Sequence, residues 1–250
     1  MASIGSGWGR ARRPGGIDRR IVIGVAVALG VVVLLLHFHR IGRDQVIYFL
    51  VLIPSIILHE ISHGAVAFVF GDDTARRQGR LSLNPIRHID PVGTVIVPAV
   101  LSLAGVGAFG WAKPVPVNTA RLRSPRNHTV VVSLVGPLTN VILALAAGFV
   151  YMAVVPADAR TGYAPMPLVG EVLLLAGLAN LVLAVFNFIP CPPLDGAAVL
   201  ERLIPARHLA DYYRLQPALM FLPFVLVLLF QRQWATLIDH LFSWWANLFA

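Results

Sequence analysis

Long apolar runs, separated by short polar segments, dominate the pattern of this chain. The clearest runs cover residues 21–38, 46–70, 129–155 and 171–189. About 20 apolar residues are enough for an α-helix to cross the hydrocarbon core of a bilayer. We therefore predict an all-α membrane protein, a multi-pass helical bundle with about five to six transmembrane helices.

A further apolar run at 92–111 is interrupted by residues that disfavour a regular helix. These are Gly93, Pro98, Gly105, Gly107 and Gly110. Irregular backbone at membrane depth has to be covered by protein or water. If this run enters the membrane and returns, the basic loops on either side of it stay on one face, as the positive-inside rule favours. We expect a re-entrant or short β-containing segment after the second transmembrane helix.

Two apolar segments close the chain. Residues 217–230 form a shorter run, and residues 234–250 are rich in aromatic side chains. An aromatic amphipathic segment of this kind either spans the bilayer or lies in its interface.

Basic residues orient the chain. The first 20 residues are rich in glycine and contain Arg10, Arg12, Arg13, Arg19 and Arg20. Cytoplasmic segments carry an excess of Lys and Arg, so we expect a cytoplasmic N-terminus in a multi-pass protein of the cell membrane. We interpret residues 1–20 as a disordered basic tail and residues 21–250 as a single integral-membrane domain.

Composition agrees with a membrane protein. Hydrophobic residues make up 57% of the 250 positions and charged residues only 13%, about half the share in soluble domains. The net charge of +8 comes from basic residues between the apolar runs, where they contact lipid headgroups. No basic face interleaved with aromatic residues exists, so we expect no nucleic-acid partner. Cys191 is the single cysteine and cannot form an internal disulfide.

Two histidines and a glutamate interrupt the apolar run at 46–70. They form the segment HEISH, with His59 and His63 four positions apart and Glu60 beside the first. Residues i and i+4 share one helical face, so both imidazoles can reach one ion. The H-E-x-x-H pattern is typical of zinc proteases, in which zinc lowers the pKa of a water molecule and a carboxylate, here Glu60, takes its proton. A structural ion or a hydrogen-bond network without hydrolysis is the alternative.

A catalytic zinc ion usually takes three protein ligands. Asp195 follows the span that ends at Ile189 and is the first candidate for the third, although Asp-Gly after two prolines also forms ordinary turns. Cys191 is a softer rival ligand that also fits a small buried hydrophobic residue. His88 and Asp90 are weaker rivals, which we expect to be solvated.

Three amides also lie at membrane depth. Asn140 and Asn187 are candidates for contact with the substrate backbone or the oxyanion, and interhelical hydrogen bonding is an equal alternative. Asn180 has no motif around it, and we interpret it as a packing residue.

These segments, taken together, resemble a known family. The residues His59–His63 (HEISH), Gly136–Asn140 (GPLTN) and Asn187–Gly196 (NFIPCPPLDG) resemble, in this order, the three motifs of the site-2 protease family. The resemblance covers residues 46–215. The intervening segments GDDTARRQGRLSLNPIRHIDPVGT and GWAKPVPVN look like those of short bacterial and archaeal members without a PDZ or CBS domain.

The resemblance implies an intramembrane zinc metalloprotease. It implies one Zn²⁺ per chain held by His59, His63 and Asp195, with Glu60 as general base. The implied substrates are transmembrane segments of membrane proteins, and residues 81–118 would form a small sheet or loop that holds an extended substrate. The alternatives are a zinc-binding membrane transporter and a non-catalytic membrane scaffold.

Overall fold

The computed structural model describes residues 42–90 and 113–249. The basic tail, the first predicted span at 21–38 and the interrupted run at 92–111 lie outside these residues. Residues 42–89 and 113–249 belong to one compact unit.

Three long helices confirm the central membrane-spanning predictions. They are α2 (Arg43–Val69, 27 residues), α5 (Pro125–Val154, 30 residues) and α7 (Leu168–Phe188, 21 residues). Each is long and apolar enough to cross a membrane, judged by length and composition. Their bounds differ from those of the apolar runs by only a few residues. The predicted total of about five to six spans and the re-entrant segment stay predictions.

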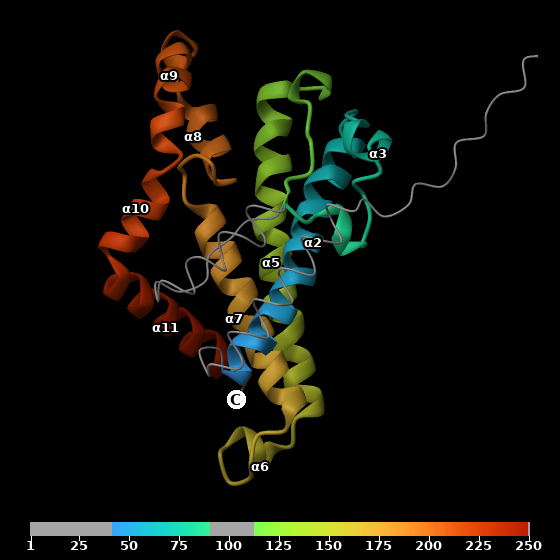
Figure 1. Cartoon of the computed structure of the whole chain (residues 1–250), viewed down its shortest axis with the longest axis vertical. Coiled ribbons are helices and arrows are strands. Elements are labelled where there is room, and N and C mark those ends of the chain that lie inside the picture. The colour runs from blue at the N-terminus through green and yellow to red at the C-terminus, as the bar shows by residue number, and fades with distance from the viewer. Residues whose placement is uncertain (1–41, 91–112, 250) are drawn as a thin grey trace, which may run out of the picture. The chain divides into compact units, whose positions relative to one another are not determined.

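The three helices pack against one another as the core of the described unit (Figure 1). At one end, Arg43 at the start of α2 pairs with Glu171 in the first turn of α7, with 2.6 Å between Nη2 and Oε2. At the other end, the Arg123 N–H, just before α5, donates to the carbonyl of Phe70, just after α2. α2 and α7 therefore run parallel, and α5 runs antiparallel to both.

A glycine ends α2 and turns the chain. The Gly71 N–H donates to Phe68 O at 3.1 Å and the Asp72 N–H to Ala67 O at 2.9 Å, which is the Schellman pattern. Gly71 has a φ of 108°, a left-handed conformation that residues with a Cβ rarely adopt. The turn directs the polar segment that follows α2 back along the bundle.

Short helices connect the long ones and follow them. They are α3 (Thr74–Arg77), η1 (Pro85–Arg87), η3 (Thr119–Arg121), α6 (Ala157–Arg160), α8 (Ala197–Leu203), η4 (Ala206–His208), α9 (Leu209–Leu219), α10 (Leu222–Leu229) and α11 (Gln231–Asn247). No strand occurs within 42–90 and 113–249. The apolar run at 217–230 is divided between α9 and α10.

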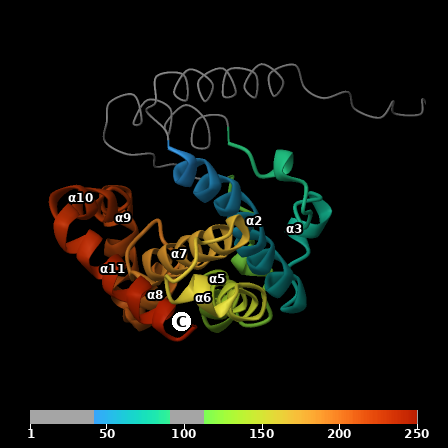
Figure 2. The ribbon, with the colours of Figure 1, turned by 90° about the horizontal axis from the view of Figure 1, so that it is seen from below.

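The aromatic-rich C-terminal segment forms α11, which packs on α7 (Figure 2). Trp245 is its buried anchor, and the indole N–H donates to Ala144 O of α5 at 3.1 Å. The indole ring lies so close to Gly177 of α7 that a Cβ there would overlap it. The position of α11 thus depends on an aromatic side chain that fits over a glycine.

Candidate metal centre

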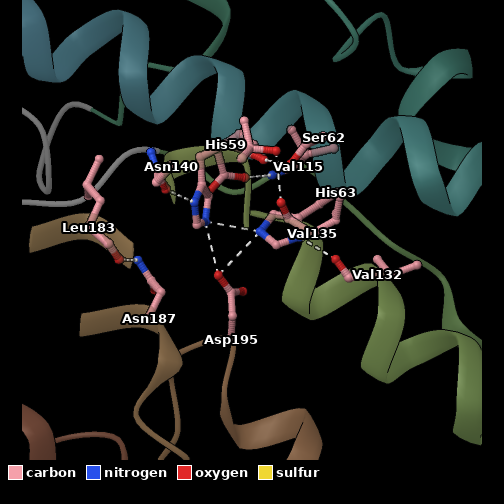
Figure 3. A network of polar contacts seen from close by, with 12 residues as sticks. His59, Ser62, His63, Val115, Val132, Val135, Asn140, Leu183, Asn187 and Asp195 are labelled. Carbon is pink, nitrogen blue, oxygen red and sulfur yellow. Dashed lines mark hydrogen bonds and ion pairs between the residues drawn. The ribbon is translucent and has the colours of Figure 1, made fainter. Parts of the chain in front are cut away.

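α2 brings the two motif histidines to one face, as the i, i+4 spacing predicts. The side chains of His59 and His63 point toward α5 and the chain after α7, and the residues are only 6% and 8% exposed. Their Nε2 atoms are 3.1 Å apart (Figure 3). Both imidazoles lie inside an apolar helix and are almost completely shielded from solvent.

Asp195 approaches the same point from the loop that follows α7. Its Oδ2 lies 3.0 Å from His59 Nε2 and 3.4 Å from His63 Nε2. The next residue anchors the loop, because the Gly196 N–H donates to Asn187 O at 2.8 Å. Asp195 thus places one carboxyl oxygen against both imidazoles.

The other nitrogen of each imidazole faces an acceptor. His59 Nδ1 lies 2.6 Å from Asn140 Oδ1, and His63 Nδ1 lies 2.6 Å from Val132 O. These oxygens only accept, so in the neutral rings each Nδ1–H donates and each Nε2 keeps its lone pair. Both lone pairs then point at Asp195 Oδ2, a buried oxygen to which no group in the described ranges donates a hydrogen bond. Three converging lone pairs of this kind repel one another unless a proton or a metal ion lies between them, so the group can hold a metal ion.

The spacing of the three atoms fits a zinc ion. Two ligand atoms about 2.1 Å from a tetrahedral zinc ion are separated by about 3.4 Å. The three separations here are 3.0, 3.1 and 3.4 Å. Among the described residues, this is the one group of three or more His, Cys, Asp or Glu side chains with the proximity that a metal ion requires. Two imidazoles and a carboxylate are a common ligand set of catalytic zinc.

Glu60 follows His59 on α2, and a backbone amide holds its carboxylate. Its Oε2 accepts a hydrogen bond from the Val115 N–H at 2.7 Å. This contact fixes the carboxylate through one oxygen. Val115 belongs to the irregular segment 113–118, which approaches α2 at the level of the histidines.

Two buried charged residues hold this segment in place. The Arg80 guanidinium donates to the carbonyls of Lys113 and Pro114, at 2.6 and 3.0 Å. Asp72 Oδ2 accepts from the Asn118 N–H at 2.6 Å. Burial would raise the pKa of Asp72, but hydrogen bonds from Thr74 and Asn118 outweigh it and lower that pKa below its usual value. The turn after α2 and the loop after α3 therefore fix the amide that reaches Glu60.

α5 contacts the two imidazoles at Gly136, the first residue of the GPLTN segment. A Cβ on Gly136 would lie 2.7 Å from His59 Cε1 and closer still to the His63 ring. Real Cβ atoms essentially never approach other atoms this closely. Pro137 follows and is fully buried. The Gly-Pro pair thus allows α5 to lie against the two rings.

The predicted rival ligands lie away from this point. Cys191 Sγ is 3.7 Å from Leu219 O and belongs to no group of potential ligands in the described part of the chain. Our expectation that His88 is solvated is wrong, because it is only 3% exposed and its Nε2 lies 2.8 Å from Ser82 O. His88 instead ties the loop around η1 to its own backbone.

The three predicted amides occupy different positions. Asn140 lies behind His59, and Asn180 contacts Asn140, with Nδ2 of Asn140 2.8 Å from Oδ1 of Asn180. Our interpretation of Asn180 as a packing residue therefore misses a polar contact. Asn187 donates to Leu183 O at 3.0 Å within α7. The substrate or oxyanion roles of Asn140 and Asn187 stay predictions.

Comparison with known proteins identifies similar sequences. The model of "Peptidase family M50" matches residues 162–230, which include α7 and the loop with Asp195. The "Putative zinc metalloprotease YwhC" of Bacillus subtilis is 43% identical over 155 residues, which cover 62% of this chain and 67% of that protein.

Two mycobacterial proteins are also similar, both named "Putative zinc metalloprotease Rip2". The one from Mycobacterium tuberculosis is 33% identical over 176 residues, which cover 64% of this chain and 62% of that protein. The one from Mycolicibacterium smegmatis is 32% identical over 151 residues, which cover 59% and 53%. The chain thus spans less than two thirds of the length of these two relatives. No solved structure matches the chain.

Proposed function

Because the chain belongs to peptidase family M50, the site-2 protease family, and is a zinc metalloprotease, we propose that it cleaves transmembrane segments of membrane proteins inside the bilayer. The location of the metal centre carries this proposal. His59, Glu60 and His63 lie within α2, a helix long and apolar enough to cross a membrane. His63 is six residues from the end of α2, which corresponds to about 9 Å along the helix axis.

The proposed ligands are His59, His63 and Asp195, supported by the convergence of their lone pairs. Zinc bound there would polarise the scissile carbonyl and lower the pKa of a water molecule. The contacts of the two Nδ1 atoms with Asn140 and Val132 O would leave both Nε2 atoms free to bind such an ion. We assign the catalytic core to residues 46–215.

The proposed general base is Glu60. Its carboxylate takes a proton from the attacking water and delivers that proton to the nitrogen of the leaving amine. The hydrogen bond from Val115 holds Oε2 and limits rotation of the carboxylate. Since the carbonyls of a regular helix are already hydrogen-bonded within the helix, a substrate span has to unwind locally before its peptide bond is accessible.

A reconstituted reaction tests this proposal. The purified protein and a single-span substrate are placed in liposomes, and the products are mapped by mass spectrometry. We expect a cut within the span, loss of cleavage after removal of zinc by a chelator, and recovery when zinc is returned. Cleavage confined to the soluble parts of the substrate, or cleavage that continues without zinc, would contradict it.

A further inference from the structure

A chain of buried polar side chains extends from the metal centre across all three long helices. It begins with His59 and Asn140, whose contact is drawn in Figure 3. It continues from Asn140 to Asn180 on α7, and from Asn180 Nδ2 to Ser55 Oγ on α2 at 2.9 Å. Asn140, Asn180 and Ser55 are 0%, 3% and 4% exposed. In an apolar helical core, these side chains have only one another and nearby carbonyls as partners.

Backbone carbonyls set the direction of every hydrogen bond in this series of polar side chains. Asn180 Nδ2 lies 2.9 Å from Ala176 O, which only accepts, so the amide nitrogen has to be on that side. Ser55 Oγ donates its single proton to Val51 O at 3.0 Å and therefore accepts from Asn180. The oxygen of the Asn180 amide is thus left for Asn140.

The same reasoning extends to the imidazole. Because Asn180 presents its oxygen, Asn140 has to donate through Nδ2, and its own oxygen then faces His59 Nδ1. An amide oxygen accepts only, so His59 carries its proton on Nδ1 and presents the Nε2 lone pair. If the Asn140 amide were reversed, its NH₂ group would face Nδ1 and favour the tautomer in which Nε2 carries the proton. That tautomer cannot bind a metal ion through Nε2.

We propose that Asn180 and Ser55 are positioning residues for the metal centre, which act through Asn140 to hold His59 in the tautomer that binds zinc. The inference rests on the proposed role of His59 as a zinc ligand. Neither residue touches the metal centre itself. The partners behind metal-binding histidines typically change metal affinity by about 10- to 100-fold when they are removed.

The test measures zinc affinity by competition with a chelator. Asn180→Leu removes all three hydrogen bonds of the Asn180 amide at similar volume and frees the Asn140 amide to reverse. We therefore expect zinc to bind about tenfold or more weakly. In the double variant Asn140→Asp/Asn180→Leu, a carboxylate that can only accept hydrogen bonds faces His59 Nδ1. We expect its zinc affinity to recover most of the loss, because the imidazole proton is again held on Nδ1.

Controls separate this role from packing. Ser55→Ala removes one of the two acceptors of the Asn180 NH₂ group and is the second variant if Asn180→Leu does not fold. We expect it to weaken zinc binding less than Asn180→Leu, because Ala176 O still holds the amide. Thr139→Val removes a comparable hydroxyl that donates to Val135 O within α5, and we expect it to leave zinc affinity unchanged. The Co²⁺ absorption spectrum of each variant reports whether the tetrahedral ligand geometry is kept.

Two outcomes would overturn the proposal. One is parental zinc affinity in both Asn180→Leu and Ser55→Ala. The other is a double variant that binds zinc as weakly as Asn180→Leu, which would make Asn180 a packing residue only. Both outcomes are measured as zinc affinity without substrate, so they are distinct from a failure of the protein to cleave transmembrane segments.

Discussion

Glu60→Gln is expected to lower the cleavage rate by about 10²- to 10⁴-fold, the usual contribution of a general base, while zinc stays bound. Glutamine has nearly the same shape as glutamate but cannot take the proton of the attacking water. Its amide oxygen can still accept from the Val115 N–H, so the segment 113–118 should stay in place. The measurement is the cleavage rate of a reconstituted transmembrane substrate, with zinc content determined in the same samples.

Glu171→Gln is the matched control for this variant. Glu171 lies at the other end of the bundle, in an ion pair with the exposed Arg43, and ion pairs with exposed partners contribute little to stability. We expect cleavage close to the parental rate. Parental cleavage by Glu60→Gln would assign the base to another residue, and loss of zinc from it would show that Glu60 acts in metal binding.

Gly136→Ala is expected to weaken zinc binding by about 10- to 100-fold and to lower cleavage with it. The added Cβ would lie 2.7 Å from His59 Cε1 and closer to the His63 ring. Neither ring can easily turn away, because Asn140 and Val132 O hold their Nδ1 atoms. Overpacking of this kind costs about 1–3 kcal/mol, and about 1.4 kcal/mol corresponds to a tenfold change in affinity. Chelator competition measures the change.

Gly148→Ala distinguishes this effect from general destabilisation. Gly148 lies on the same helix, and a Cβ there would overlap the ring of Phe249, far from the metal centre. We expect both variants to unfold at lower temperature and only Gly136→Ala to lose zinc affinity. Equal zinc affinity in the two variants would mean that the close approach of α5 to the imidazoles does not require a glycine at position 136.

The sequence predicts the features that depend on local spacing. The bounds of α2, α5 and α7 follow from apolar length, and the shared face of His59 and His63 follows from helical periodicity. The helical fold class and the shared face of these two candidate ligands therefore need no tertiary information.

The features that depend on contacts distant in sequence could not be predicted in the same way. Spacing alone did not distinguish Asp195 as a ligand from Asp195 as a turn residue, because the answer depends on how the loop after α7 returns to α2. The Val115 amide that reaches Glu60 is 55 residues away in the chain. Only tertiary packing brings these groups together.

The sequence does contain a signal for the series of polar side chains behind His59. Asn180 and Ser55 are polar residues inside apolar runs, and such residues are costly enough to need partners. Their partners belong to other helices, so no pattern within one helix identifies them. The lack of a motif around Asn180 favours a packing role, whereas the structure shows that its amide contacts Asn140 and Ser55.

The most direct test of the proposed zinc centre compares the parent protein with Asp195→Ala. Zinc per chain and cleavage of a transmembrane substrate are measured in the same purified samples. We predict about one zinc ion per chain and cleavage in the parent, with both lost in the variant, because only two ligands would remain. Zinc and cleavage that both survive in Asp195→Ala would contradict the assignment of His59, His63 and Asp195 as the catalytic metal centre.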